Sequence, residues 1–245
     1  MLFRSILPSA VECIAQAKHK GIKVFIATGR PLGIINNIDG ILPFIDGYLT
    51  ANGAHCIVGN EVVYHQPILK ADVELILNEA TKRDYSCVVV GQDAIGTFNY
   101  KDNIDRIFRR MLDIHGVDYN IPIEELLKTD ILELTPFVSV QQEQQLMPRI
   151  PNCVSARWHP EFMDVTSRLA DKGRGLTAIA QHLGIALSDC VAFGDGGNDI
   201  SMFVAAGIGV AMGNAGDNVK QAANFVTKHI DEEGIMHAMK YLGIV

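Results

Sequence analysis

The residues best suited to chemistry lie in one glycine-rich turn, CVAFGDGGNDISMF, at positions 190–203. Asp195, Asn198 and Asp199 follow a short apolar run and precede a predicted helix. Carboxylate oxygens suit Mg²⁺, which typically takes one or two protein carboxylates together with waters and a substrate phosphate. Helix capping by Asn198 or Asp199 could account for one of these residues. A metal site explains the whole cluster better, so we predict that Asp195 and Asp199 bind Mg²⁺.

Two further stretches carry groups that can bind phosphate. In IATGRP, Thr28 follows an apolar run, Gly29 lets the backbone approach a ligand closely, and Arg30 could add a two-pronged contact. An ordinary strand-to-helix turn with Pro31 at the first helical position explains this stretch about as well. In ADKGRG, Lys172 stands at the start of a predicted helix, where it can neutralise phosphate. A lone lysine is more often a solvated surface residue.

The elements that must position these groups alternate between strands and helices. Apolar runs such as IKVFIA, CVAFGDG and GIGVAMGN end in glycine-rich turns, and helical stretches separate them. This order predicts an α/β fold with a doubly wound, Rossmann-like parallel sheet. Between residues 66 and 166 the predicted strands are mixed or alternating in polarity, which is typical of an inserted α+β domain. We therefore expect a discontinuous core, 1–65 and 167–245, and a cap domain inserted at 66–166.

Composition limits the partners of this protein. The chain has 245 residues, a formal net charge of −7 and 48% hydrophobic residues. This balance argues against a general nucleic-acid or membrane-surface binder. The five cysteines are scattered and form no C-x-x-C pair, which favours reduced thiols in the cytoplasm. No apolar run approaches the ~20 residues of a membrane span, and the start of the chain does not resemble a signal peptide.

A phosphate and a divalent cation at the carboxyl edge of a parallel sheet point to phosphoryl transfer. The stretches IATGRP, NGA, DKGRGL, FGDGGNDISM and GVAMGNA, in this order and spacing, resemble the Cof-type sugar-phosphate phosphatases of the haloacid dehalogenase superfamily. The resemblance covers essentially the whole chain, including an inserted α/β cap. Its motifs are specific as an ordered set rather than one by one.

The resemblance implies a role for each matching residue. Thr28 would bind the transferring phosphoryl group, and Lys172 would pair with that group and with the nucleophile. Asp195 and Asp199 would hold Mg²⁺. The remaining substrate-facing and supporting positions would be Gly29, Arg30, Asn52 and Asn198.

The family's first motif, D-x-D-G-T, is the one departure. It supplies the aspartate nucleophile and the general acid/base, yet no D-x-D occurs in these 245 residues. The opening MLFRSILPSAV resembles the segment just after that motif. Either the recorded chain begins late, or the loss is genuine and leaves a phosphate-binding but non-hydrolytic protein. We favour the first, because losing that strand would leave unpaired backbone in the core. We expect the chain as printed to show no turnover.

The predicted function is Mg²⁺-dependent hydrolysis of small phosphorylated metabolites, with sugar phosphates first. A phosphomutase of related chemistry is the main alternative among enzymes. A phosphate-binding or regulatory protein is the alternative from another class. The sequence does not indicate the oligomeric state.

Overall fold

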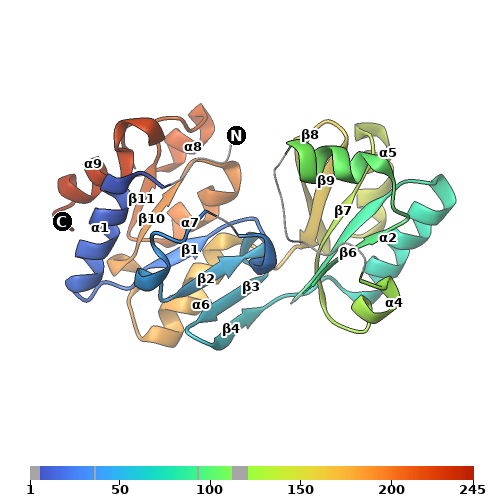
Figure 1. Cartoon of the computed structure of the whole chain (residues 1–245), viewed down its shortest axis with the longest axis horizontal. Coiled ribbons are helices and arrows are strands. Elements are labelled where there is room, and N and C mark those ends of the chain that lie inside the picture. The colour runs from blue at the N-terminus through green and yellow to red at the C-terminus, as the bar shows by residue number, and fades with distance from the viewer. Residues whose placement is uncertain (1–5, 36, 93, 112–120) are drawn as a thin grey trace. The chain divides into compact units, whose positions relative to one another are not determined.

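The computed structural model describes residues 6–35, 37–92, 94–111 and 121–245, and the described chain divides into two compact units (Figure 1). The core unit combines Arg4–Gly29, Asn36–His65 and Asp171–Val245. The insertion unit holds Gln66–Ala170 together with Arg30–Ile35. The fold class predicted from the sequence, an α/β core with an inserted α+β unit, is confirmed.

The core unit contains two small sheets rather than one. Their strand orders are β1-β2-β3-β4 and β10-β11-β12. The pairs β1–β2, β10–β11 and β11–β12 are parallel, whereas β3 and β4 extend the first sheet as antiparallel strands. The strands are β1 (Phe25–Ala27), β2 (Gly47–Thr50), β3 (His55–Val58), β4 (Glu61–His65), β10 (Val191–Gly194), β11 (Ile208–Ala211) and β12 (Phe225–Val226). The helices are α1 (Pro8–His19), α6 (Lys172–Leu183), α7 (Ile200–Ala205), α8 (Asp217–Ala222) and α9 (Gly234–Tyr241).

Helix α1 illustrates how local sequence sets these boundaries. Pro8 occupies the first turn, where its missing N–H costs no hydrogen bond, and Gly21 follows the helix with a φ of +81°. Cys13 and Ala17 are buried and pack with Met239 of α9, which lies beside α1 (Figure 1). This apolar contact joins α1 to α9 within the core unit.

An apolar cavity of about 540 Å³ lies between β1 and β10. Each of these strands is the last of its sheet, and no described strand pairs with the edge that faces the other. Residues of α1, α6 and α9 also line this cavity.

The insertion unit is built on one antiparallel sheet with the order β6-β5-β7-β9-β8. Its strands are β5 (Cys87–Gly91), β6 (Ile95–Phe98), β7 (Ile131–Pro136), β8 (Cys153–His159) and β9 (Phe162–Ser167). Its helices are α2 (Lys70–Arg83), α3 (Asp102–Ile104), a π-helical segment Asp105–Met111, α4 (Ile123–Leu126) and α5 (Val140–Leu146).

Both faces of this sheet are covered by helices. One face packs against α2, α4 and α5, with Ile76, Leu134 and Val165 fully buried between them. The other face packs against the segment 102–111 through Ile107, Phe108 and the aromatic ring of Phe162. Alternating strand positions feed these two cores, which explains the mixed polarity pattern of the sequence.

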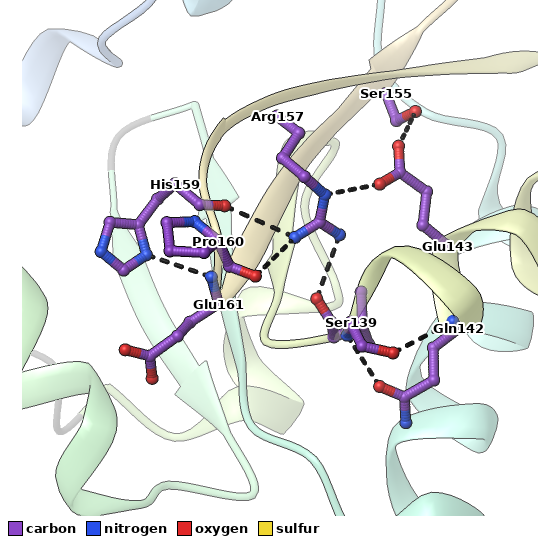
Figure 2. A network of polar contacts seen from close by, with 9 residues as sticks. Ser139, Gln142, Glu143, Ser155, Arg157, His159, Pro160 and Glu161 are labelled. Carbon is purple, nitrogen blue, oxygen red and sulfur yellow. Dashed lines mark hydrogen bonds and ion pairs between the residues drawn. The ribbon is translucent and has the colours of Figure 1, made fainter.

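Arg157 joins strand β8 to helix α5 (Figure 2). Its Nε donates to Glu143 Oε2 at 2.7 Å, and Ser155 donates to the other carboxylate oxygen at 2.7 Å. The remaining guanidinium nitrogens donate to the backbone carbonyls of Val138 and Pro160 at 3.0 and 3.1 Å. Because these partners belong to the insertion unit itself, Arg157 serves its internal stability.

The five cysteines are free thiols, as predicted, and four of them are buried. Burial raises the pKa of the Cys56 thiol to about 12, so it is neutral at physiological pH. Among the described residues, no helix is long and apolar enough to cross a membrane.

Candidate phosphate and metal site

The glycine-rich turn after β10 is organised by the side chain of Asp199. Its Oδ2 accepts hydrogen bonds from the backbone N–H groups of Asp195 and Gly196, both at 3.0 Å. A Cβ at Gly194 would stand only 2.3 Å from the Asp199 carboxyl carbon, so only glycine fits there. Asp199 therefore performs the turn-capping role that the sequence left open as an alternative to metal binding.

Lys172 is the cationic partner of this turn. It is the first residue of α6, and the preceding Asp171 caps the helix by accepting the Arg174 N–H at 2.9 Å. The Lys172 Nζ lies 2.6 Å from Asp199 Oδ1 and 3.3 Å from the backbone oxygen of Ala27. Only 5% of the Lys172 side chain and 7% of the Asp199 side chain are exposed. Lys172 is thus a buried side chain that bonds to the end of β1 and to the turn after β10, and is not a solvated surface lysine.

The Thr28–Gly29 turn lies beside two asparagines. The Thr28 N–H donates to Leu49 O at 2.8 Å, which fixes the end of β1 against β2. Asn198 donates from Nδ2 to Asn52 Oδ1 at 2.8 Å. A Cβ at Gly29 would approach the same Asn52 oxygen to 2.9 Å, so Gly29 lies directly against this amide pair. The structure thus brings together Thr28, Gly29, Asn52 and Asn198 from three separate stretches of sequence.

Asn52 is held in an unusual backbone conformation. Its φ of 55° is in the left-handed region, which asparagine tolerates better than most residues. The next residue, Gly53, has a φ of +91°, and a Cβ there would stand 2.3 Å from Asp171 O. The NGA stretch therefore packs Gly53 against the residue before α6, while the Asn52 side chain contacts Gly29 and Asn198.

Asp195 has a partner that the sequence analysis did not single out. Asn214 donates from Nδ2 to Asp195 Oδ2 at 2.7 Å, and its own Oδ1 accepts the Ile230 N–H at 3.2 Å. Asn214 lies just after β11, in the GVAMGNA stretch. Its position could have identified it from the sequence, because it is a polar residue that follows the carboxyl end of a neighbouring parallel strand.

The two predicted metal ligands differ in how their oxygens are used. Both Asp199 oxygens are engaged, by Lys172 and by backbone N–H groups. For Asp195, the described residues supply only the Asn214 contact, which leaves Oδ1 for a ligand. Within the described ranges no group of three or more histidines, cysteines or carboxylates could hold a metal alone. One carboxylate oxygen fits Mg²⁺, which completes its shell with waters and substrate phosphate.

Arg30 directly follows Gly29 and is half-buried; it falls in the insertion unit, whereas Thr28 and Gly29 belong to the core unit. Its contact with a substrate phosphate stays a prediction. The apolar cavity between β1 and β10 is separate from the candidate phosphate and metal site, because Thr28, Lys172 and Asp195 do not line it.

Comparison with known proteins assigns the family. The model of the haloacid dehalogenase-like hydrolases matches residues 4–239. The chain is 29% identical over 245 residues to a putative phosphatase, YkrA, of Bacillus subtilis strain 168, covering 99% of this chain and 93% of that protein. It is 32% identical to an HMP-PP phosphatase of Escherichia coli, covering 85% and 83% of the two chains. A solved sugar phosphatase of subclass IIB superposes with a TM-score of 0.88 at 41% identity, and the match covers 98% of this chain and 93% of that chain.

The chain therefore belongs to the haloacid dehalogenase-like hydrolase family. The relatives given above are phosphatases by name, one of them putative, and the resemblance to the Cof-type, subclass IIB branch is confirmed. One expectation finds no support in these comparisons. Because the family model matches from residue 4 onward, the match does not support inactivity from a missing nucleophile.

Proposed function

We propose that this protein is a Mg²⁺-dependent phosphatase of small phosphorylated metabolites, with sugar phosphates as the first class to test. The observation that carries the proposal is the buried Lys172 ammonium. It bonds to Asp199 and to the carbonyl of Ala27, the residue just before Thr28. A fixed cation at the end of β1, next to a hydroxyl and a glycine turn, suits a phosphate dianion.

Each residue of the cluster would have one task. Thr28 and the Gly29 backbone would bind phosphate oxygens, and Lys172 would neutralise their charge. Asp195 would hold Mg²⁺ through the oxygen that Asn214 does not occupy. Asp199 would keep Lys172 and the turn in place, and a direct Asp199–metal contact would require one of its oxygens to be released. When bound, Mg²⁺ would offset charge that develops on the transferring phosphoryl group.

The remaining roles in the proposal concern the substrate. Asn52 and Asn198 would position it from the core unit, and the insertion unit would act as the cap that selects it and excludes water. The relatives named above act, by their names, on sugar phosphates and on HMP-PP. The proposal assigns no nucleophile, because the D-x-D pair of the family is not among the 245 residues.

Release of inorganic phosphate from a panel of phosphorylated sugars and nucleoside precursors tests this function. We expect release that depends on Mg²⁺ and stops with a chelator. Asp195→Asn should abolish the Mg²⁺-dependent release of phosphate, while the unfolding midpoint stays near that of the wild type. Interconversion of sugar-phosphate isomers without phosphate release would instead assign a phosphomutase. Titration with inorganic phosphate gives a second readout, since binding without any turnover would support a non-hydrolytic protein.

A further inference from the structure

Glu133 is a buried carboxyl group with an unpartnered oxygen. It lies on β7, the middle strand of the insertion sheet, and only 6% of the residue is exposed. Its Oε2 is buried and accepts no hydrogen bond from the described residues. A buried polar atom in this state destabilises a fold, and native structures keep few of them. The oxygen therefore calls for a donor that the described part of the chain does not supply.

Cross-strand pairing places a second carboxyl group beside Glu133. Glu133 pairs with Thr166 of β9, and directly paired residues share one face of a sheet. Asp164 stands two residues before Thr166, so it belongs to the same face, where it accepts a hydrogen bond from Thr135 Oγ1 at 3.0 Å. Burial raises the pKa of Glu133, and the nearby charge of Asp164 raises it further.

The other neighbours of Glu133 on this face are apolar. Val90 of β5 pairs with Glu133, and the segment 102–111 packs on the same face through Ile107 and Phe108. None of these three side chains is titratable. Among the described residues, Asp164 is therefore the charged group on this face that acts on Glu133.

The face is accessible beside Asp164. Ala156 of β8 pairs with Asp164 and is exposed, so solvent reaches the sheet at that position. Asp164 itself is half-buried, whereas Thr166 is only 5% exposed. A ligand that approaches over Ala156 meets Asp164 first and Glu133 one residue pair deeper.

A ligand that fits this pair must donate hydrogen bonds and carry positive charge. A hydroxyl group would give Glu133 Oε2 a donor, but it would not offset the repulsion that Asp164 exerts on an ionised Glu133. Mg²⁺ prefers near-octahedral oxygen ligation, and the described residues hold no group of three carboxylates, histidines or cysteines that could bind a metal. A primary ammonium has three donors and one compact positive charge, so it meets both requirements.

We propose that Glu133 and Asp164 form a binding site for a primary ammonium group. An ammonium nitrogen lies about 2.8 Å from each oxygen that it bonds, so it bridges oxygens up to roughly 5.6 Å apart. Glu133 and Asp164 are diagonal neighbours, whose positions are roughly 7–8 Å apart, and their side chains can shorten that span. The site lies within the insertion unit. If the proposed phosphatase function holds, on which this last step rests, the favoured substrates are amino-sugar phosphates.

NMR titration of the full chain with D-glucosamine tests the site, and D-glucose is the uncharged control ligand. At pH 6.5 we expect glucosamine to bind about tenfold more tightly than glucose, because charge-assisted hydrogen bonds are roughly twice as strong as neutral ones. The largest shifts should fall on the backbone amides of Glu133, Asp164 and Thr166. Calorimetry in two buffers of different ionisation enthalpy should also detect release of up to about one proton, since a bound ammonium favours ionised Glu133.

A pair of variants assigns this preference to Glu133. Glu133→Gln keeps the size of the side chain and removes its charge, so the preference for glucosamine should fall to within about twofold and the proton release should vanish. Glu125→Gln is the matched control in the same unit. Glu125 is an exposed carboxylate on α4 that bonds to Lys128 at 2.6 Å, so its loss should leave both readouts unchanged.

Three outcomes would overturn the proposal. Equal affinity for glucose would show that the site recognises hydroxyl groups. An unchanged preference in Glu133→Gln would place the ammonium elsewhere, and displacement of glucosamine by millimolar Mg²⁺ would assign the pair to a metal ion. Neither probe carries phosphate, so these results do not depend on turnover. If no sugar phosphate is hydrolysed, the proposed function fails while selective glucosamine binding still supports the ammonium site.

Discussion

Two buried carboxylates, one in each unit, are treated in opposite ways. Asp199 of the core unit has a lysine at 2.6 Å and two backbone N–H donors at 3.0 Å. Glu133 of the insertion unit is 6% exposed, and its Oε2 has no hydrogen-bond partner among the described residues. Burial, together with the neighbouring charge of Asp164, raises the pKa of Glu133 well above its usual value. The core unit gives its buried carboxylate three close hydrogen-bond donors, whereas burial favours the neutral form of Glu133.

The two carboxyl groups differ in their surroundings: Asp199 holds together a polar site, whereas Glu133 lies in an apolar core. Glu133 pairs across β7 and β5 with Val90, on the face that packs against Phe108 and Phe162. A neutral carboxyl costs less in such surroundings than a carboxylate. Asp199 instead belongs to the cluster proposed to bind phosphate and metal, where it accepts a hydrogen bond from the Lys172 side chain.

Removing Lys172 should have the largest effect. Lys172→Met leaves Asp199 buried without its cation, and we expect the free energy of unfolding to fall by about 3–5 kcal/mol. Urea denaturation measures this loss. The matched control is Lys82→Met, since Lys82 is 70% exposed and 3.8 Å from Glu79, and should cost under about 0.5 kcal/mol. Adding Asp199→Asn to Lys172→Met should recover part of the loss. A similar small loss for both lysines would contradict the role assigned to Lys172.

Replacing Glu133 by a neutral residue should raise the free energy of unfolding rather than lower it. Its folded pKa is raised, so its burial is tolerated below the unfolded pKa of about 4.3, and stability falls as pH rises above that value. Glu133→Gln removes this cost, and we expect a gain of about 1–2 kcal/mol at pH 8 that disappears at pH 4. Thermal unfolding at the two pH values measures it. A gain of equal size at pH 4 would show that charge is not the cause.

A substitution at Asn214 tests the role of Asp195 in the proposed metal site, because Asn214 donates a hydrogen bond to Asp195. Asn214→Ala removes the donor that orients the Asp195 carboxylate, and we expect Mg²⁺ affinity to fall about 10–100-fold. Calorimetric titration of Mg²⁺ in the presence of inorganic phosphate measures this affinity. Asn218→Ala is the control, because Asn218 is exposed on α8. Unchanged Mg²⁺ affinity in Asn214→Ala would remove Asp195 from the metal site.

The smallest effect concerns Asp46, a partly exposed carboxylate. Burial would raise its pKa, but hydrogen bonds from Lys18, from the Val24 N–H and from Lys23 outweigh it and lower the pKa overall. A lowered folded pKa gives stability that is present above the unfolded pKa of about 3.9 and is lost as pH falls further. Asp46→Asn should therefore cost about 0.5–1 kcal/mol at pH 7 and nothing near pH 2. Denaturation midpoints that differ equally at both pH values would refute this.

Much of the fold could be read from the sequence. Apolar runs that end in glycine turns predicted the parallel strands, and the change of pattern between Gln66 and Thr166 predicted the inserted unit. These signals are local, because strand burial and turn chemistry depend on neighbouring residues. The β3–β4 antiparallel extension was not predicted, since pairing partners depend on contacts distant in sequence. Whether the insertion acts as a cap stays a prediction.

The sequence singled out residues of the candidate site but did not predict which of them contact one another. Residue type and spacing singled out Thr28, Lys172, Asp195 and Asp199, because turns at the ends of parallel strands meet at one edge of a sheet. The sequence could not tell which of the two aspartates pairs with Lys172, since their contacts are made across β1, α6 and β10. It also left Asn214 without a role, because its partner Asp195 is close only in the folded chain.

The sequence by itself determined the alternation of elements, the glycine turns and the kinds of group available for chemistry, because these follow from local propensity and side-chain type. Only the tertiary structure decided which charged side chains contact one another. It buried Lys172 against Asp199, left one oxygen of Asp195 for a ligand, and separated β1 from β10 by an apolar cavity. Burial and pairing arise from segments far apart along the chain, so no local pattern encodes them.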